Sequence, residues 1–491
     1  MAALATRDRD PPRKAQALSV TLGPASPAAG PVSGASSPSE RTDLAERLRE
    51  RRAHVAVIGL GFAGLPLAMA FAAVGHRVTG IDVDAVRVAD LNAGRSHIAD
   101  VPDAELVRHV TAGRFAATTD YAALAAVDSV TICVPTPLLP GQVPDLRFIE
   151  SAVDGLAPYL HPGMLVVLES TTYPGTTEEI VQARVEARGL RTGTDVFVGF
   201  APERIDPGST SSPGLAVRSI PKLVGGATPT CLAHVQALYE PVVDRLVPVS
   251  SLRTAEMAKL VENSFRMVNI AFANEVALMC DRLGINVWEV IDAAATKPYG
   301  FLAHYPGPGL GGHCIPVDPY YLSWKMKTLN VPARFIELAG EINRAMPAHV
   351  VGKVATALEA RGKTIRGARV LVLGVTYKRD VADVRESPSL DILGLLAARG
   401  ANVAYHDPYV AELEVTVQAA GSIDPRGPTV HLSCEELATA VRSADCVIVA
   451  TDHTSYDWDA IAREATLVVD TRNALAQAVA SGTARAAVVR L

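Results

Sequence analysis

Few folds accommodate a strand that runs directly into a turn of the form Gly59-Leu60-Gly61-Phe62-Ala63-Gly64. The residues before this turn, His54–Ile58, are typical of a β-strand, and those after it, Leu65–Val74, have helical character. A second strand is predicted to end near Asp82, 18 residues beyond the turn. This order of elements, with G-x-G-x-x-G spacing at the turn, is typical of a βαβ unit that binds a dinucleotide.

Each glycine of the turn has its own task in such a unit. Gly59 permits the tight turn, Gly61 lets the backbone approach a pyrophosphate, and Gly64 lets the helix pack closely on the strand. Asp82 would accept hydrogen bonds from the adenosine ribose, which favours NAD over NADP. Arg87 leaves a second possibility open, because it could stack on adenine or reach a 2′-phosphate. The alternative to a cofactor site is a turn with packing value only, in which Asp82 caps the strand end.

Composition excludes several classes of protein. The 491 residues are 49% hydrophobic and 20% charged, so the chain is not disordered throughout, and a net charge of −6 makes it a poor nucleic-acid binder. Six scattered cysteines lack C-x-x-C spacing, which argues against a zinc site and a disulfide scaffold. No metal is expected, and a reducing cytoplasm is the simplest compartment. The stretch from Val55 to Gly75 is uncharged, but its glycines and proline favour a strand–turn–helix over a membrane span.

Strands and helices alternate through the first half of the chain. Further strands are predicted at Ser129–Val134, Met164–Leu168 and Val196–Phe200. This rhythm predicts a parallel sheet with helices on both faces. From Thr254 to Leu283 the chain has no Gly or Pro and carries apolar residues at helical spacing, which predicts one helix about 45 Å long. Such a helix usually joins two lobes or forms a subunit interface.

A second α/β region is predicted from Ala368. Its strands are expected at Arg369–Leu373, Val403–His406, Cys446–Thr451 and Thr466–Asp470, with a helix at Pro388–Ala398. The fold class is therefore α/β, with two Rossmann-like doubly wound domains joined by a long central helix. The expected divisions are a disordered Ala/Pro/Ser-rich tail (1–48), an NAD-binding Rossmann domain (49–250), a central helical domain (251–350) and a C-terminal Rossmann-like domain (351–491).

A second glycine-rich segment, residues 305–318, ends in a candidate nucleophile. Four glycines and two prolines precede Cys314, which follows His313, and Asp318 comes four residues later. A thiolate is the form of cysteine that attacks carbon, and backbone amides of a glycine loop can stabilise it. The alternative is that Cys314 is a small buried hydrophobe, the commonest fate of a free cysteine. The glycine loop favours catalysis.

Two polar residues of the predicted long helix share one face with each other. Lys259 and Asn263 are spaced i and i+4, and Arg266 lies three residues further on. Because most of that helix is apolar, this stripe indicates a polar site. The alternative is a solvated face on which Glu262 and Arg266 form a surface ion pair, and the sequence does not separate the two.

Polar residues also follow predicted strands, at the edge where parallel sheets bind ligands. Pro135 and Thr136 follow one strand, and Glu169 follows another that is wholly apolar. A carboxylate is seldom buried without purpose, so Glu169 is a candidate functional residue. Three cations follow the first strand of the second region: Lys378, Arg379 and Arg385. Cations there suit a phosphorylated ligand, whereas the alternative is a turn rich in solvated charge.

Together these segments resemble the UDP-glucose/GDP-mannose dehydrogenase family over almost the whole chain from His54. The motifs are G-F-A-G-L-P-L-A at 61–68, C-V-P-T-P at 133–137, E-S-T-T at 169–172, G-L-G-G-H-C-I-P-V-D at 309–318 and R-E-S-P at 385–388. The segment from Pro306 resembles the branch that oxidises UDP-N-acetylhexosamines. UDP-N-acetylglucosamine is the favoured substrate, with UDP-N-acetylmannosamine and UDP-glucose behind it.

The resemblance implies an NAD-dependent four-electron oxidation of a sugar C6 alcohol to the acid. Cys314 would form a thiohemiacetal and then a thioester, which water hydrolyses. Lys259 and Asn263 would stabilise the oxyanion, and Glu169 and Asp318 would act as acid/base groups, with Glu169 assigned to hydrolysis. The implied cofactor-binding residues are Gly59, Gly61, Phe62, Ala63, Gly64, Asp82, Arg87, Pro135, Thr136, Thr171 and Arg385. The implied residues near the nucleotide sugar, in part in the C-terminal domain, are Arg204, Arg266, Tyr305, Gly311, Lys378 and Arg379.

Two departures and two rival functions accompany this resemblance. Several relatives carry an arginine upstream of the glycine loop that reaches a neighbouring subunit's substrate, whereas residues 297–305 hold Lys297 and His304 but no arginine. The N-terminal tail has no counterpart in the family. The rivals are a two-electron hydroxyacid dehydrogenase, which needs no cysteine, and a non-catalytic NAD-binding protein. A homodimer is expected through the long helix, and the product would serve a cell-surface polysaccharide.

Overall fold

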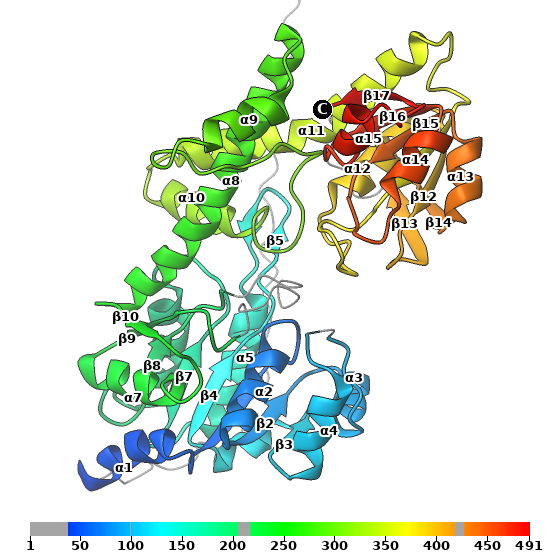
Figure 1. The fold of residues 1–491 in the computed structure, drawn as a ribbon. Helices are drawn as coiled ribbons and strands as arrows, with labels where there is room; N and C mark the ends of the chain where they lie inside the picture. Colours follow the sequence, from blue (N-terminus) through cyan, green and yellow to red (C-terminus); the bar gives the residue numbers. More distant parts are fainter. Residues whose placement is uncertain (1–37, 99, 205–216, 418–426) are drawn as a thin grey trace, which may run out of the picture. The chain divides into compact units, whose positions relative to one another are not determined.

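The structure is a computed structural model that describes residues 38–98, 100–204, 217–417 and 427–491 (Figure 1). The N-terminal region contains α1 (Pro38–Arg49), β1 (His54–Ile58), α2 (Gly64–Val74), β2 (Arg77–Ile81), α3 (Ala85–Asn92), α4 (Asp103–Thr111), β3 (Phe115–Thr118), η1 (Tyr121–Ala126), β4 (Ser129–Ile132), β5 (Leu138–Leu139), β6 (Val143–Pro144), α5 (Arg147–Leu156), η2 (Ala157–Tyr159), β7 (Leu165–Leu168), η3 (Thr177–Gln182), α6 (Ala183–Ala187), β8 (Phe197–Phe200), β9 (Lys222–Gly226), α7 (Pro229–Tyr239) and β10 (Leu246–Pro248).

Eight strands of this region form one sheet in the order β10-β9-β8-β7-β4-β1-β2-β3. The strands from β8 to β3 are all parallel, as the alternating pattern predicts. Strand β9, which was not predicted, runs antiparallel to β8, so the predicted parallel arrangement stops at this edge of the sheet. The reversal places the first residue of β9, Lys222, near the carboxyl ends of the parallel strands.

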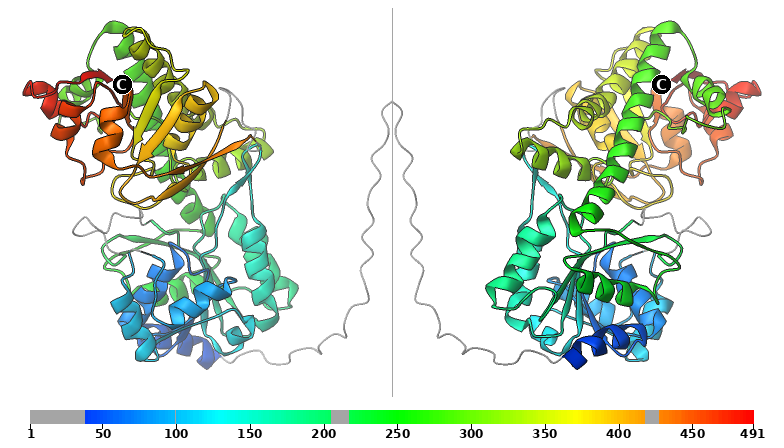
Figure 2. Two further views of the ribbon diagram at one scale, coloured as in Figure 1. Left: turned by 90° about the vertical axis from the view of Figure 1, so that its right-hand side faces the viewer. Right: turned by 90° about the vertical axis from the view of Figure 1, so that its left-hand side faces the viewer.

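The central region is helical, with α8 (Leu252–Leu283), α9 (Val287–Ala295), α10 (Asp318–Thr328) and α11 (Arg334–Glu359). The predicted long helix is confirmed as α8, which has 32 residues and is seen as one continuous helix in the right-hand view of Figure 2. It begins two residues before the predicted start because the Ser251 side chain accepts a hydrogen bond from the amide of Thr254. It ends at Gly284, whose φ of 69° suits glycine.

The C-terminal region contains β11 (Arg369–Leu373), α12 (Pro388–Ala398), β12 (Asn402–His406), β13 (Glu412–Thr416), β14 (Thr429–Ser433), α13 (Leu437–Ser443), β15 (Cys446–Val449), α14 (Trp458–Glu464), β16 (Leu467–Asp470), α15 (Ala476–Ala480) and β17 (Ala487–Arg490). Five strands form a parallel sheet in the order β12-β11-β15-β16-β17, while β13 and β14 form a separate hairpin. The predicted α/β architecture with two doubly wound domains and a long helix between them in sequence is therefore confirmed.

Alternation of side chains along the strands divides each core between two faces of its sheet. In β1, Val57 packs with residues of α2 and α7, whereas Ile58 packs on the other face with α5. Strand β11 repeats the pattern, since Val372 packs with α11 and α12 and Leu373 with α13 and α14. Both sheets are thus covered by helices on both faces, which leaves their strand ends as the places where a ligand can reach the backbone.

Helix α1 corrects one expectation. Disorder was predicted for residues 1–48, but Leu44 and Leu48 are 2% and 0% exposed and belong to the core that contains α7. The two leucines are four residues apart, so they lie on one face of the helix. The prediction of disorder rested on the Ala/Pro/Ser composition of the tail and missed this spacing. The rest of the predicted tail, residues 1–37, lies outside the described residues. Within the described ranges, no helix is both long and apolar enough to cross a membrane.

Candidate active site

A cavity of about 1190 Å³ unites most of the residues that the sequence singled out. It is lined by strand ends of the N-terminal sheet, by one face of α8, by the glycine loop and by the segment after β11. The predicted residues in its wall are Gly59, Gly61, Phe62, Ala63, Asp82, Arg87, Pro135, Thr136, Glu169, Thr171, Arg204, Lys259, Asn263, Arg266, Tyr305, Gly311, Cys314, Lys378 and Arg385. Gly64, Asp318 and Arg379 lie outside the wall.

Cys314 lies at the end of a loop whose backbone is held by neighbouring elements. The amide of Gly307 donates to Oδ1 of Asn274 in α8 at 2.9 Å. The amide of Gly312 donates to the carbonyl of Arg385 at 2.9 Å, and its φ of 83° favours glycine. The Cys314 thiol is half-buried and lines the cavity. This position suits a nucleophile better than the inert core cysteine that was the alternative.

Lys259, Asn263 and Asp318 form a buried polar group beside the loop. Lys259 and Asn263 of α8 are 6% and 4% exposed and Asp318 of α10 is 2% exposed, so this part of the α8 stripe is not the solvated face that the sequence left open, whereas Arg266 is exposed. The amide of Asn263 donates to Oδ2 of Asp318 at 2.6 Å. Burial raises the pKa of Asp318 to about 6, although Lys259 and the Asn263 bond oppose this. A carboxyl with such a pKa can exchange a proton near neutral pH.

Glu169 is buried directly after β7 and is surrounded by polar partners. Its exposed fraction is 1%, and its Oε2 lies 2.9 Å from Nζ of Lys222. The hydroxyl of Tyr239, the last residue of α7, donates to its Oε1. Burial raises the pKa of Glu169 to about 6, and Lys222 limits the rise. The carboxylate is therefore ionised at neutral pH and fixed at both oxygens.

The glycine turn has the geometry that dinucleotide binding requires. Gly59 has a φ of 90°, and a Cβ there would lie 2.4 Å from the carbonyl oxygen of Cys133. A Cβ on Gly64 would lie 1.8 Å from the carbonyl oxygen of Gly59, whereas a Cβ on Gly61 would meet no atom within 4 Å. Gly61 therefore presents bare backbone to the cavity, and the other two glycines are needed for the turn itself.

The Asp82 carboxylate already has partners inside the protein. Its Oδ2 accepts the amide of Leu60 at 2.9 Å, and the guanidinium of Arg87 lies 3.0 Å away. Arg87 is thereby held beside the adenosine side of the predicted site, and its charge is balanced by an acid. This pairing weakens the alternative in which Arg87 binds a 2′-phosphate.

The predicted cations after β11 separate in the structure. Arg385 pairs with Asp383 at 2.7 Å, and its guanidinium lies 4.5 Å from the ring centre of Phe62 in the glycine turn. This contact joins the C-terminal region to the predicted cofactor site. Arg379 instead pairs with Asp452, and neither of these two residues lines the cavity.

Three consecutive regions of the chain match one family. The NAD binding domain of the UDP-glucose/GDP-mannose dehydrogenase family matches residues 53–243, its central domain matches 253–345, and its UDP binding domain matches 371–477. The chain belongs to the UDP-glucose/GDP-mannose dehydrogenase family. The resemblance drawn from the motifs is therefore confirmed.

The relatives of this chain are named for different sugar substrates. The UDP-N-acetyl-D-mannosamine dehydrogenase of Yersinia pestis is 37% identical over 82% of this chain and 94% of its own. The NDP-N-acetyl-D-galactosaminuronic acid dehydrogenase of Ralstonia solanacearum is 35% identical over 85% of this chain and 95% of its own. The solved UDP-D-ManNAc dehydrogenase of Pyrococcus horikoshii has a TM-score of 0.75 at 34% identity, covering 86% of this chain and 96% of that one.

As a member of this family, the chain is an NAD-dependent nucleotide-sugar dehydrogenase, an oxidoreductase. The residues present fit NAD, because Gly61 leaves bare backbone at the cavity and α2 begins at Gly64 with no acid in its first turn. The N-terminus of α2 and the turn would hold the pyrophosphate, and Asp82 would face the ribose.

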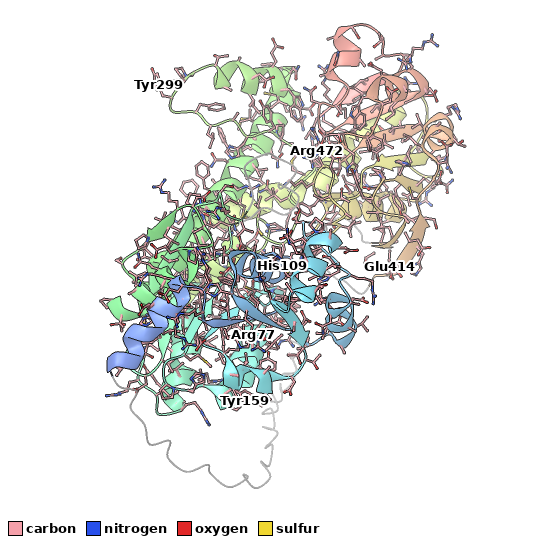
Figure 3. All side chains as sticks on the ribbon, turned by 60° about the horizontal axis from the view of Figure 1, so that its bottom comes forward. Arg77, His109, Tyr159, Tyr299, Glu414 and Arg472 are labelled. Carbon is pink, nitrogen blue, oxygen red and sulfur yellow. The ribbon has the colours of Figure 1, made fainter. Side chains whose placement is uncertain are left out.

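Sequence analysis missed Arg472 in this dehydrogenase. Arg472, labelled in Figure 3, follows β16 and lines the cavity, and its Nε donates to the carbonyl of Ala450 at 2.8 Å. Its terminal nitrogen would lie 2.9 Å from a Cβ on Gly307, so it touches the glycine loop. Arg472 could have been found from the sequence, because it follows an apolar strand, which is the pattern that singled out Glu169. Lys222 and Tyr239 were also missed.

Proposed function

We propose that this dehydrogenase oxidises the C6 primary alcohol of a UDP-N-acetylhexosamine to the uronic acid, with UDP-N-acetylglucosamine as the leading substrate. The observation that carries the proposal is a cavity-lining thiol, Cys314, on a glycine loop beside buried Lys259, Asn263 and Asp318. A two-electron hydroxyacid dehydrogenase has no use for this nucleophile. The Yersinia pestis and Ralstonia solanacearum relatives are both named for N-acetylated sugars, which supports an N-acetylhexosamine as the sugar of the substrate.

The side chains divide the work between two oxidations. NAD, when bound, accepts the hydride in each of them. Cys314 attacks the aldehyde carbon, and the Lys259 ammonium and the Asn263 amide stabilise the oxyanion that forms. Asp318 lies just outside the cavity wall, where it holds the Asn263 amide by a hydrogen bond, and it exchanges the proton of the reacting oxygen once substrate is bound. Glu169 accepts the proton of the water that hydrolyses the Cys314 thioester.

The test is the amount of NADH formed per mole of limiting sugar nucleotide. UDP-N-acetylglucosamine, UDP-N-acetylmannosamine, UDP-N-acetylgalactosamine and UDP-glucose are supplied separately, and two NADH per UDP-N-acetylglucosamine is the expected result. Two NADH from another sugar would keep the mechanism and replace the substrate. One NADH would remove the thioester role of Cys314, and none from any sugar would overturn the proposal. The Cys314→Ser variant serves as the control and should not complete the second oxidation.

We also propose a homodimer in which α8 pairs with α8 of a second copy. Val261, Phe265, Phe272 and Met279 are 48–58% exposed and lie on one face of the helix. An exposed apolar stripe of this kind marks an interaction surface. Light scattering after size-exclusion chromatography should give twice the chain mass for the wild type and one chain mass for Phe272→Asp. Val479→Asp, on α15, is the matched control and should leave the mass unchanged.

The proposed compartment is the cytoplasm. None of the six cysteines, all of which lie in the described ranges, forms a disulfide, and Cys314 must stay reduced to act as a nucleophile, which requires a reducing environment. We propose that the uronic acid product serves a cell-surface polysaccharide. Alkylation of lysed cells under native and reducing conditions would show whether Cys314 is reduced in the cell, and a disulfide at Cys314 would contradict this assignment.

A further inference from the structure

A buried ionic cluster surrounds Glu169, and its other members have no role in the reaction described so far. Lys222 is 6% exposed, and its Nζ lies 2.9 Å from Glu169 and 3.5 Å from Oε2 of Glu203. Tyr239 is fully buried, donates to the second oxygen of Glu169, and has its ring centre 5.4 Å from the Lys222 ammonium. Side chains from β9, from α7 and from the segment after β8 are therefore gathered around the Glu169 carboxylate.

This arrangement is not explained by packing. A buried ion pair rarely adds stability over apolar residues of similar volume, because both charges must leave water. Lys222 lies over the ring of Tyr239, which belongs to the apolar core around β9 and α7. What the pair does provide is a carboxylate of fixed orientation, with one oxygen bound by an ammonium and the other by a hydroxyl. An ionised carboxylate has about four acceptor positions, so these two bonds leave Glu169 able to take a proton.

We propose that Lys222 and Tyr239 are positioning residues for the hydrolytic half of the reaction, holding Glu169 ionised and oriented toward the water that attacks the Cys314 thioester. The water oxygen bonds to the acyl carbon, its proton passes to the Glu169 carboxylate, and the Cys314 sulfur leaves as a thiolate. The products are the uronic acid and the free enzyme. This inference rests on the proposed function, since it assigns partners to the proposed base.

The charges around Glu169 support the assignment. The groups that face it are the Lys222 ammonium from β9, the Glu203 carboxylate after β8, the Tyr239 hydroxyl from α7 and the Cys133 thiol after β4. Burial and Glu203 raise the pKa of Glu169, and Lys222 is the main group that lowers it. The carboxylates in turn raise the pKa of Lys222 against the effect of burial. Without Lys222, Glu169 would therefore hold a proton at neutral pH and could not accept another.

The experiment follows one turnover of the full-length Lys222→Met enzyme with NAD and the sugar nucleotide that gives two NADH. We expect the first turnover to release two NADH per active site at close to the wild-type rate. Steady-state kcat at pH 7 should fall about 100-fold, and intact-mass spectrometry should detect an acyl adduct on Cys314. The acid limb of the kcat–pH profile should move up by about two to three pH units, so that much of the rate returns near pH 9. Lys222→Arg should restore the wild-type profile.

Matched controls separate positioning from stability. Lys353→Met removes a lysine whose ion pair with Asp281 lies outside the cavity, and it should leave the pH profile unchanged. Tyr239→Phe removes only the hydroxyl and should lower kcat about tenfold with partial adduct, whereas Tyr405→Phe, at an equally buried tyrosine, should not. If Lys222→Met does not fold, Tyr239→Phe carries the test.

The results distinguish a failure of the positioning role from a failure of the proposed function. Loss of the first NADH burst together with the second, or an unmoved acid limb without adduct, would overturn the positioning role. If the wild-type enzyme itself forms only one NADH and never an acyl adduct, the proposed function fails instead.

Discussion

The two α/β domains begin with the same backbone device and use it differently. Strand β1 is followed by Gly59 with a φ of 90°, and strand β11 is followed by Gly374 with a φ of 79°. A Cβ on Gly59 would lie 2.4 Å from the neighbouring strand's Cys133, and a Cβ on Gly374 would lie 2.4 Å from Thr451 in the matching place. The second domain thus keeps the first glycine of the fingerprint although it lacks the other two.

An acid at the end of the next strand completes the device in both domains. Asp82 after β2 accepts the amide of Leu60 at 2.9 Å, and Asp407 after β12 accepts the amide of Val375 at 2.7 Å. Asp82 lines the cavity, whereas Asp407 is covered by His453, whose Nε2 lies 3.0 Å from it. The same position can therefore face a cofactor or be used wholly for structure, according to what covers it.

The two domains differ most in the length of the segment that connects this glycine to the following helix. Helix α2 begins at Gly64, five residues after Gly59, while α12 begins at Pro388, fourteen residues after Gly374. The short turn offers backbone amides to an anion, and the long segment offers cationic side chains such as Lys378. One scaffold thereby presents backbone amides at one strand end and cationic side chains at the other, and the length of a single connection decides which.

The largest expected effect separates packing from binding within the first turn. Gly64→Ala forces a Cβ to within 1.8 Å of the Gly59 carbonyl oxygen, so we expect a loss of about 3 kcal/mol in the free energy of unfolding. Gly61→Ala meets no neighbour, so its stability should change by less than about 0.5 kcal/mol. Its NAD affinity should fall at least tenfold, because the methyl occupies the pyrophosphate approach. Urea unfolding and NAD titration measure both, and equal stability losses would contradict the division.

The two strand-end acids should respond oppositely to removal of their charge. Asp407→Asn disrupts a buried bond with His453 and should reduce the free energy of unfolding by about 2–3 kcal/mol without changing NAD affinity. Asp82→Asn should weaken NAD binding about tenfold, with a stability loss near 1 kcal/mol. A change in NAD affinity for Asp407→Asn would show that the second device is not purely structural.

The Asp407 effect should depend on pH. Burial opposes ionisation of Asp407, but the His453 bond and backbone amides outweigh it and lower its pKa. A carboxyl whose pKa is depressed in the folded state adds stability above its unfolded pKa, about 3.9, and this stability is lost as pH falls through the folded pKa. The difference in unfolding free energy between wild type and Asp407→Asn should therefore be full at pH 6 and shrink below about pH 4. A gap that is constant down to pH 3 would contradict the ionic contribution.

The sequence predicted those features that depend on local pattern. The strands beside Gly59 and the long helix α8 follow from residue periodicity, and Cys314 and Glu169 follow from glycine content and strand ends. Lys222 could not be placed, because it lies 53 residues from Glu169 in sequence and reaches it only through the reversal of β9. Strands β13 and β14 do alternate, with Leu413 and Val415 buried between exposed Glu412 and Glu414, so the sequence carried a strand pattern here that the prediction overlooked. For Lys222, long-range pairing rather than residue type was the missing information.

The smallest effect tests the long connection itself. Lys378 lines the cavity, whereas Arg379 does not and pairs with Asp452. The two adjacent cations should therefore differ in how much each contributes to binding the substrate. Lys378→Gln removes a charge from the nucleotide-sugar side and should raise KM for the sugar nucleotide about tenfold, which corresponds to about 1.4 kcal/mol. Arg379→Gln loses only an exposed ion pair and should change KM less than about twofold. NAD affinity, set by the short turn, should be the same in both variants. If Arg379→Gln instead raises KM as much as Lys378→Gln, the long connection binds phosphate with its whole charge and not with the one side chain in the cavity wall.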